Sequence, residues 1–357
     1  MRQISHTPIT ATKNAKRTLF KRLLGKRLMI LTTYVGSFPL SYSKDNILRI
    51  LRDVEKIPID YPCYPQLKDF IFQFLQPISL KNPSLVTKDN EYILKSKSLR
   101  VLDEPIAVDD LLLTLNYFKN KKTIKGIRAC VTGPFTLASR IVVSGKENAV
   151  GLRKTALTEP DVINALAETM SNICKYFAEA GAVWVNIDEP ILSVIVGRRK
   201  ILYGLSQEFI IETLNATISR CNASIRGIHV CGVLSPLLRD TLLMTDFKVL
   251  DHEFKDTPAN IEIFDKQTLE KYDKKISFGC ISSKNTRVEN IEETVALIKK
   301  AANIIGIENI GFIKPDCGFR GLKSICGEEE AYRISIKKLK LLKTAQEIMN
   351  REYGFSV

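Results

Sequence analysis

Short apolar runs rich in β-branched residues alternate along the chain with longer segments that have the periodicity of amphipathic helices. Segments 160–180 and 288–305 are typical of such helices, and each is followed by a glycine, Gly181 or Gly306. The apolar runs lie near residues 30–36, 57–63, 126–132, 183–188, 225–231, 247–253, 276–282 and 309–315. This alternation predicts eight strands separated by helices.

Strands that alternate with helices predict a parallel sheet. Eight repeats favour an α/β fold of the TIM-barrel type, a (β/α)8 barrel, in which the stretch 64–125 carries insertions. The alternative is an open doubly wound sheet. Neither GxGxxG nor GxxxxGK[ST] occurs in the chain, which weakens any nucleotide-binding interpretation. We expect residues 29–357 to form a single catalytic barrel.

The basic charge is concentrated at the N-terminus. Residues 1–28 contain eight Lys and Arg residues and no acidic residue, so they account for more than half of the net charge of +14. This segment could be a nucleic-acid-binding arm or a transit-type leader. We favour a disordered extension upstream of Met29. The other charges are spread over helix-like surfaces such as 338–343, which we interpret as a solvated face, so nucleic acid is an unlikely partner.

The eight cysteines are scattered without a paired framework, which indicates a reducing compartment and predicts a cytoplasmic protein. No segment approaches the roughly 18 uninterrupted apolar residues that span a bilayer, so we expect no membrane partner.

Polar and sulfur-bearing residues gather where the apolar runs end, which is the active-site end of a TIM barrel. His229 and Cys231 are two apart on one strand and therefore share a side, and Cys317 leaves the last strand at the same end. Glu253 ends the sixth run, whereas His252 points to the opposite side. A His/Cys/Cys/Glu set suits Zn²⁺. The alternative is buried core, because a cysteine in a strand is usually a small apolar side chain.

Two other strand ends carry groups suited to an amino acid. Asp188 and Glu189 could cap a helix, or a carboxylate at this position could hold a substrate ammonium group, and we predict both as substrate-binding residues. Gly36 and Ser37 could form a plain tight turn, or an N–H and hydroxyl cradle for a carboxylate. A carboxylate for the ammonium group and a cradle for the carboxylate would together form a binding site for an amino acid.

Six motifs in this order resemble those of the cobalamin-independent methionine synthase family, in its short archaeal form. The resemblance runs from about Met29 to about residue 345. It implies a TIM barrel with zinc bound by His229, Cys231, Glu253 and Cys317. It also implies that homocysteine is methylated to methionine, with its amino group at Asp188 and its carboxylate at Ser37. The motifs are TTYVGSFP (32–39), VTGPFTL (131–137), VNIDEP (185–190), HVCG (229–232), RVENIEE (287–293) and PDCGF (315–319).

The chain departs from the long members of that family in three ways. Nothing like their N-terminal half, which helps bind the methyl-folate donor, precedes Met29. Lys284 stands where they have a histidine thought to protonate the leaving folate nitrogen, and Gln66 aligns with an acidic residue near the homocysteine amine. We therefore expect the donor to be methylcobalamin or a methylated corrinoid protein, because Co(I) leaves unprotonated, rather than methyl-tetrahydrofolate.

Two other functions stay open. Another thiol, such as coenzyme M, could be the methyl acceptor, although its sulfonate would favour extra basic residues and Asp188 favours homocysteine. A non-catalytic protein that binds nucleic acid through residues 1–28 would show steeply salt-dependent binding.

Overall fold

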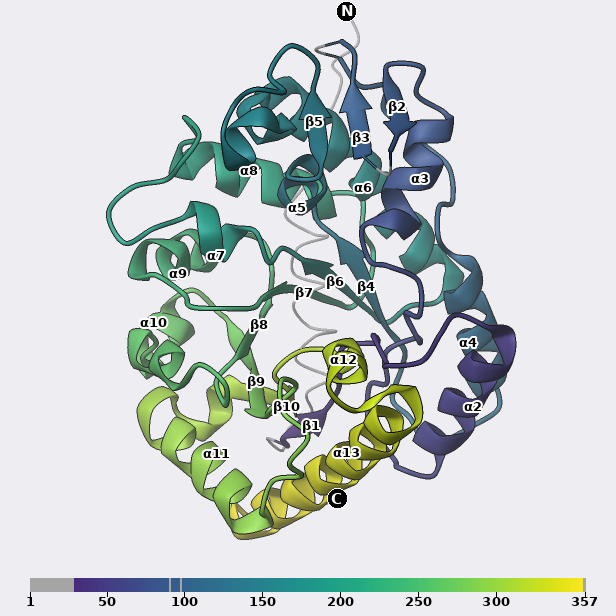
Figure 1. The fold of residues 1–357 in the computed structure, drawn as a ribbon. Coiled ribbons are helices and arrows are strands. Elements are labelled where there is room, and N and C mark those ends of the chain that lie inside the picture. The colour runs from purple at the N-terminus through teal and green to yellow at the C-terminus, as the bar shows by residue number, and fades with distance from the viewer. Residues whose placement is uncertain (1–28, 90, 97, 356–357) are drawn as a thin grey trace, which may run out of the picture.

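The computed structural model describes residues 29–355 except residues 90 and 97, so the predicted N-terminal extension lies outside the described residues. The main sheet consists of parallel strands in the order β1-β10-β9-β8-β7-β6-β4 (Figure 1). These strands are β1 (Leu31–Thr32), β4 (Arg128–Thr132), β6 (Trp184–Asp188), β7 (Ile225–Val230), β8 (Val249–Glu253), β9 (Lys275–Ile281) and β10 (Ile310–Pro315).

The predicted second strand closes this sheet without forming a regular strand. Tyr61 bridges to Thr33 beside β1, and Cys63 bridges to Arg128 of β4. Pro62 lies between the two bridges and has no N–H to donate, which interrupts the ladder at this point. The (β/α)8 barrel is therefore confirmed, with one of its eight strands reduced to isolated bridges.

Helices surround the strands as an outer ring (Figure 1). The predicted helix 160–180 is confirmed as α6, and it ends at Gly181, whose φ of 119° lies in the left-handed region. The predicted helix 288–305 begins only at Ile291, because the Asn290 side chain accepts a hydrogen bond from the N–H of Glu292 and caps the helix there. Within the described residues, no helix is both long and apolar enough to cross a membrane.

The α-helices are α2 (Lys44–Glu55), α3 (Phe72–Leu80), α4 (Asp109–Phe118), α5 (Pro134–Ala138), α6 (Pro160–Ala180), α7 (Leu192–Ile195), α8 (Gln207–Ile218), α9 (Pro236–Leu243), α10 (Lys266–Lys271), α11 (Ile291–Ile305), α12 (Lys323–Cys326) and α13 (Glu328–Glu352). The 3-10 helices are η1 (Gly151–Lys154), η2 (Ala156–Thr158), η3 (Pro258–Ile263), η4 (Ile307–Asn309) and η5 (Arg320–Leu322).

The predicted insertion contributes most of a second, smaller sheet. Strand β3 (Glu91–Leu94) lies in its centre, antiparallel to β2 (Leu85–Lys88) and parallel to β5 (Ile141–Val143). This sheet lies at the top of Figure 1, beside the barrel. The third strand comes from beyond residue 125, so the insertion packs with the loop that follows β4.

Apolar side chains fill the barrel at the end where its strands begin. They form one buried cluster, in which the rings of Trp184 and Phe312 have centroids 4.5 Å apart. The guanidinium of Arg128 lies 4.6 Å above the Trp184 ring, so a charged layer follows the apolar one. Any chemistry is therefore confined to the opposite end, where the strands finish. The cluster consists of Leu31, Tyr61, Trp184, Ile225, Val249 and Phe312.

The interpretation of 338–343 as a solvated face is wrong for Lys338. This side chain is fully buried on α13, and its ammonium lies 2.9 Å from the carboxylate of Glu289, which is buried as well. Leu339 and Leu342 are also buried, so the inner face of the helix includes a lysine whose charge is neutralised by an acid from the loop before α11.

Candidate metal centre

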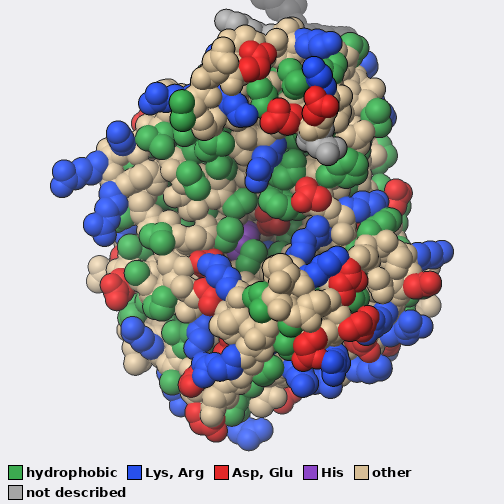
Figure 2. All heavy atoms as spheres, in the orientation of Figure 1, with side chains coloured by type: hydrophobic (Ala, Val, Ile, Leu, Met, Phe, Trp, Pro, Cys, Tyr) green, Lys and Arg blue, Asp and Glu red, His purple; other side chains and the backbone are tan. Residues whose placement is uncertain are grey.

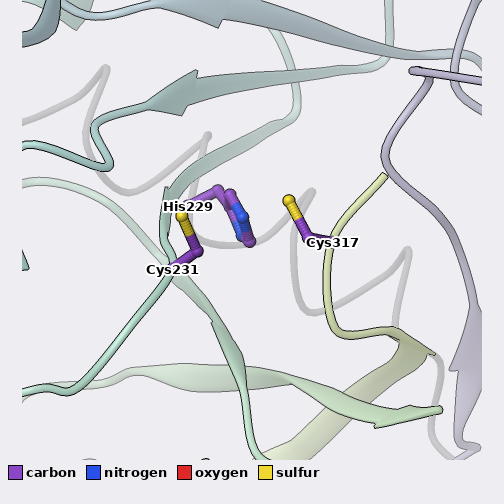
Figure 3. Close-up of side chains that lie close together, drawn as sticks. All are labelled: His229, Cys231 and Cys317. Atoms are coloured by element: carbon purple, nitrogen blue, oxygen red, sulfur yellow. The ribbon is translucent and has the colours of Figure 1, made fainter. Parts of the chain in front are cut away.

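His229, Cys231 and Cys317 come together where β7 and β10 end (Figure 3). The nearest ligand atoms of the three side chains all lie within 4.8 Å of one another. His229 is buried, whereas both cysteines are partly exposed. In Figure 3 the Cys317 sulfur points toward the imidazole, while Cys231 extends from the same strand end as His229. The fold thus brings together three of the four residues predicted as metal ligands.

The His229 ring is held in one orientation. Its Nδ1 lies 2.7 Å from Oδ1 of Asp251, and its Nε2 is buried with no hydrogen-bond partner among the described residues. Burial lowers the pKa of His229, but the charge and the hydrogen bond of Asp251 together with the neighbouring Cys317 thiol raise it to about 10. A carboxylate on one ring nitrogen and an unpartnered second nitrogen is the arrangement found in metal-binding histidines. A metal ion at Nε2 would displace a proton.

Asp251 belongs to a fully buried ion cluster beneath the candidate site. Arg128 Nη1 lies 2.7 Å from its Oδ2, and Lys314 Nζ lies 2.8 Å from its Oδ1. Burial alone would raise the pKa of Asp251, but Arg128, Lys314 and His229 hold it well below its ordinary value. The sequence analysis assigned no role to Asp251, because its two cationic partners, Arg128 and Lys314, lie far from it along the chain.

The sulfur atoms of the site are electrostatically linked. A hydrogen bond from Cys317 lowers the pKa of Cys231, and the same bond raises the pKa of Cys317. Two thiols and an imidazole supply the soft sulfur and nitrogen donors that zinc prefers. The donor set and the unpartnered Nε2 therefore fit a zinc ion.

Glu253 lies next to this group but is not part of it. Its carboxylate accepts hydrogen bonds from Lys284 Nζ, at 2.9 and 3.2 Å from the two oxygens, and from the hydroxyl of Thr257. Burial raises the pKa of Glu253, but these two donors lower it below its ordinary value. The carboxylate of Glu253, the fourth predicted ligand, is therefore hydrogen-bonded to other side chains of the protein.

Asp188 and Glu189 follow one another at the end of β6 but point in different directions. Asp188 is paired in register with His229, accepts a hydrogen bond from Asn186 Nδ2 at 2.9 Å, and has its pKa raised by burial. Glu189 is fully buried and accepts hydrogen bonds from the N–H groups of Phe135 and Thr136, at 2.9 and 2.8 Å. The capping alternative thus describes Glu189, which binds the first turn of α5. A role for Glu189 in substrate binding stays a prediction.

Ser37 lies on the opposite side of the site, against the turn that follows Cys317. Its carbonyl accepts a hydrogen bond from the N–H of Phe319 at 2.8 Å, and a Cβ at Gly318 would overlap its hydroxyl oxygen. Gly36 has to be a glycine as well, because a Cβ there would overlap the carbonyl oxygen of Tyr64.

Gln66 supports this turn. Its N–H donates to the carbonyl of Gly36 at 2.8 Å. Its side-chain amide donates to the Tyr64 hydroxyl at 2.9 Å and to the Cys130 carbonyl at 3.1 Å. The structure thus places Gln66 behind the Gly36–Ser37 turn, with its amide nitrogen engaged by the protein.

Asp316, the neighbour of Cys317 in the PDCGF motif, shapes the loop after β8. Its carboxylate accepts hydrogen bonds from three successive N–H groups, those of Phe254, Lys255 and Asp256, at 3.0, 3.1 and 2.6 Å. Burial raises its pKa to about 7. Asp316 therefore links the loop that carries Cys317 to the end of the strand that carries Glu253, a role that the motif alone did not indicate.

The strand ends open into a hollow on one face of the molecule (Figure 2). A histidine side chain is visible at the floor of this hollow, and lysine, arginine and apolar side chains surround it (Figure 2). The two cysteines of the candidate metal centre are partly exposed, so the centre is open to solvent on their side.

Comparisons with known proteins identify the family. A family model described as the catalytic domain of cobalamin-independent synthase matches residues 85–332. The chain belongs to this methionine synthase family of methyltransferases, as its motifs predicted.

Curated relatives and solved structures agree with this assignment. Methionine synthase of Methanothermobacter marburgensis is 25% identical over 82% of this chain and 94% of its own length. That of Methanothermobacter thermautotrophicus is 32% identical over 56% of this chain and 58% of its own length. A B12-independent methionine synthase from Shewanella, solved with selenomethionine, has a TM-score of 0.65 at 15% identity and covers 91% of this chain and 99% of its own. A methyltransferase from Methanosarcina mazei has a TM-score of 0.63 at 14% identity, over 94% and 98% of the two chains. At these identities the solved structures show the fold.

Proposed function

We propose that this chain transfers a methyl group to the thiol of homocysteine and so forms methionine, using zinc held by His229, Cys231 and Cys317. The observation that carries the proposal is the convergence of these three side chains, together with a buried His229 Nε2 that has no hydrogen-bond partner among the described residues. Zinc bound there would keep the substrate sulfur in its thiolate form, which is the nucleophile. Membership of the methionine synthase family supports the reaction class.

Two residues flank the centre in a way that suits an amino-acid substrate. Asp188 is the lateral neighbour of His229 and would bind the ammonium group. Ser37 adjoins the turn after Cys317 and would receive the carboxylate. Gln66 would act indirectly, by holding the Gly36–Ser37 turn. A substrate held at both ends would present its sulfur to the metal between them.

The methyl donor is a methylated corrinoid, free or carried by a protein. Lys284 stands where an acid for a folate leaving group is expected, and its ammonium is bound to Glu253. Burial lowers the pKa of Lys284, but its bond to Glu253 raises it above its ordinary value, which makes it a poor proton donor near neutral pH. A donor whose leaving group needs no proton fits this arrangement.

The test is metal analysis of the purified protein and its Cys317→Ala variant, followed by methyl-transfer assays with methylcobalamin and methyl-tetrahydrofolate in parallel. We expect about one zinc per chain in the parent and much less in the variant. Each donor is assayed with homocysteine and with coenzyme M. A parent protein without stoichiometric zinc would refute the metal centre, methylation of coenzyme M alone would refute the acceptor, and transfer from folate alone would refute the donor.

A further inference from the structure

Asn186 lies inside the barrel directly beneath Asp188. The two residues are two apart on β6, so their side chains point to the same side of the strand. Nδ2 of Asn186 donates a hydrogen bond to Oδ1 of Asp188 at 2.9 Å, and no other hydrogen bond to this carboxylate is seen among the described residues. One oxygen of Asp188 therefore has a protein donor, and the other is left for a substrate group.

The amide of Asn186 has little other use in the fold. The side chain is fully buried, and its Oδ1 has no hydrogen-bond partner in the part of the chain that the structure describes. Its Nδ2 makes one further contact, a long one of 3.5 Å to the carbonyl of Ile187. A buried polar atom without a partner is costly and calls for an explanation. The contact with Asp188 is the strongest one that this amide makes.

The neighbouring strand leaves room for the Asn186 side chain. Gly227 of β7 is paired in register with Asn186, and a Cβ at Gly227 would overlap Asn186 Oδ1 and lie 2.8 Å from Trp184 Nε1. The φ of Gly227 lies outside the left-handed region, so the glycine is required by space and not by backbone conformation. Two adjacent strands are thus matched to hold this amide in place.

A donor on Oδ1 restricts how the Asp188 carboxylate can turn. The last torsion angle of an aspartate is broad, so a carboxylate without a fixed partner rotates readily about its Cβ–Cγ bond. An ionised carboxylate only accepts hydrogen bonds, so the amide has to present its Nδ2 to Asp188. Fixing the carboxylate before the substrate arrives reduces the entropy that is lost on binding.

We propose that Asn186 is a positioning residue for the methyl acceptor, and that it holds the Asp188 carboxylate in the orientation that binds the ammonium group of homocysteine. This inference rests on the proposed function, in which Asp188 binds that group. Asn186 does not touch the substrate itself. It acts through Asp188 and favours a thiol that carries an amino group over one that lacks it.

The experiment compares two acceptors, homocysteine and 4-mercaptobutanoate, which has the same thiol and carboxylate but no amino group. Steady-state kinetics are measured on the zinc-loaded protein with methylcobalamin. We expect Asn186→Ala to raise the KM for homocysteine roughly tenfold, because the lost hydrogen bond is to a charged group. The KM for 4-mercaptobutanoate and the kcat with either acceptor should change less than about threefold, because the lost contact concerns only the binding of the amino group.

Two further variants test whether Asn186 acts through Asp188. In an Asp188→Ala background, Asn186→Ala should raise the KM for homocysteine by less than about twofold, because the two residues form one unit. Gly227→Ala keeps both residues but displaces the amide with its Cβ, and it should also raise the KM for homocysteine selectively.

Asn309→Ala is the matched control, because it also removes a fully buried amide. Asn309 precedes β10 at the end of the barrel where the strands begin. Its Nδ2 donates to the carbonyl of Ile305 at 2.9 Å, and its Oδ1 accepts from Lys275 Nζ at 3.0 Å. Asn309→Ala should lower the stability and leave the KM for both acceptors unchanged.

Three results would overturn the inference while leaving the proposed function intact. The first is an unchanged KM for homocysteine in folded Asn186→Ala or, where that variant does not fold, in Gly227→Ala. The second is an equal rise in KM for both acceptors, which would show a general structural role. The third is a full, independent effect of Asn186→Ala in the Asp188→Ala background. An unchanged KM for homocysteine in Asp188→Ala would instead refute the proposed ammonium site itself.

Discussion

Asp251 and Glu253 lie two residues apart on β8 and face the same side of the strand, yet their surroundings differ. Asp251 is sealed between Arg128, Lys314 and His229, and neither cation is exposed at all. Glu253 is bound by one lysine, whose side chain remains largely in solvent. The carboxylate of Asp251 is therefore paired with fully buried cations, whereas the carboxylate of Glu253 is paired with a cation that stays in contact with water.

The difference follows from the cost of desolvation. Removing one partner of a fully buried ion pair leaves a charge that water cannot reach, which makes the deep cluster hard to alter. The ammonium of Lys284 keeps much of its hydration, so it loses less than Arg128 or Lys314 when its partner carboxylate is removed.

The largest effect is expected from Asp251→Ala, because it leaves Arg128 and Lys314 buried without their shared anion. We expect a loss of about 3–5 kcal/mol in the free energy of unfolding, measured in urea. Glu253→Ala is the comparison variant and should cost clearly less, because Lys284 can return to solvent. Equal losses in the two variants would contradict the contrast between the layers.

The deep cluster also predicts an acid dependence. The pKa of Asp251 is well below its ordinary value in the folded protein, so its contribution to stability is present above about pH 4 and is lost as the pH falls through the folded pKa. Below about pH 4, the free energy of unfolding of the parent in urea should therefore fall with pH more steeply than that of Asp251→Ala. Parallel pH profiles would exclude this assignment.

A smaller effect is expected on the metal. Asp251→Asn changes the hydrogen bond that orients His229, and we expect zinc affinity to fall about 10- to 100-fold, which corresponds to roughly 1.4–2.7 kcal/mol. Chelator competition on the folded variant measures this loss. An unchanged zinc affinity in the folded variant would contradict this role of Asp251.

The adjacent acids of β6 give the smallest and most selective test. Glu189→Gln places an amide against the N–H groups of α5, and we expect a loss of about 1–2 kcal/mol in stability without a change in the KM for homocysteine. Asp188→Asn should do the reverse and raise KM at nearly unchanged stability. Steady-state kinetics and urea unfolding of both variants distinguish the two effects. A raised KM for homocysteine in Glu189→Gln would show that Glu189 binds the substrate.

Local signals in the sequence located much of this molecule. The spacing of apolar runs predicted the strands, Gly181 marked the end of α6, and even spacing put His229 and Cys231 on one side of β7. These features depend on residues that are close in the sequence, because strand alternation and helix capping are local properties of the backbone.

The tertiary structure decided which charges meet. Asp251 is 22 residues from His229 along the chain, and its other partners, Arg128 and Lys314, belong to strands on either side of the barrel interior. Lys338 belongs to a segment that the sequence predicts to be a solvated face, but its side chain is buried against Glu289. Sequence alone determined the barrel and the donor atoms at its mouth. Only the closed barrel decided that Glu189 caps a helix and that Glu253 faces Lys284, because burial and pairing depend on neighbours brought from distant strands.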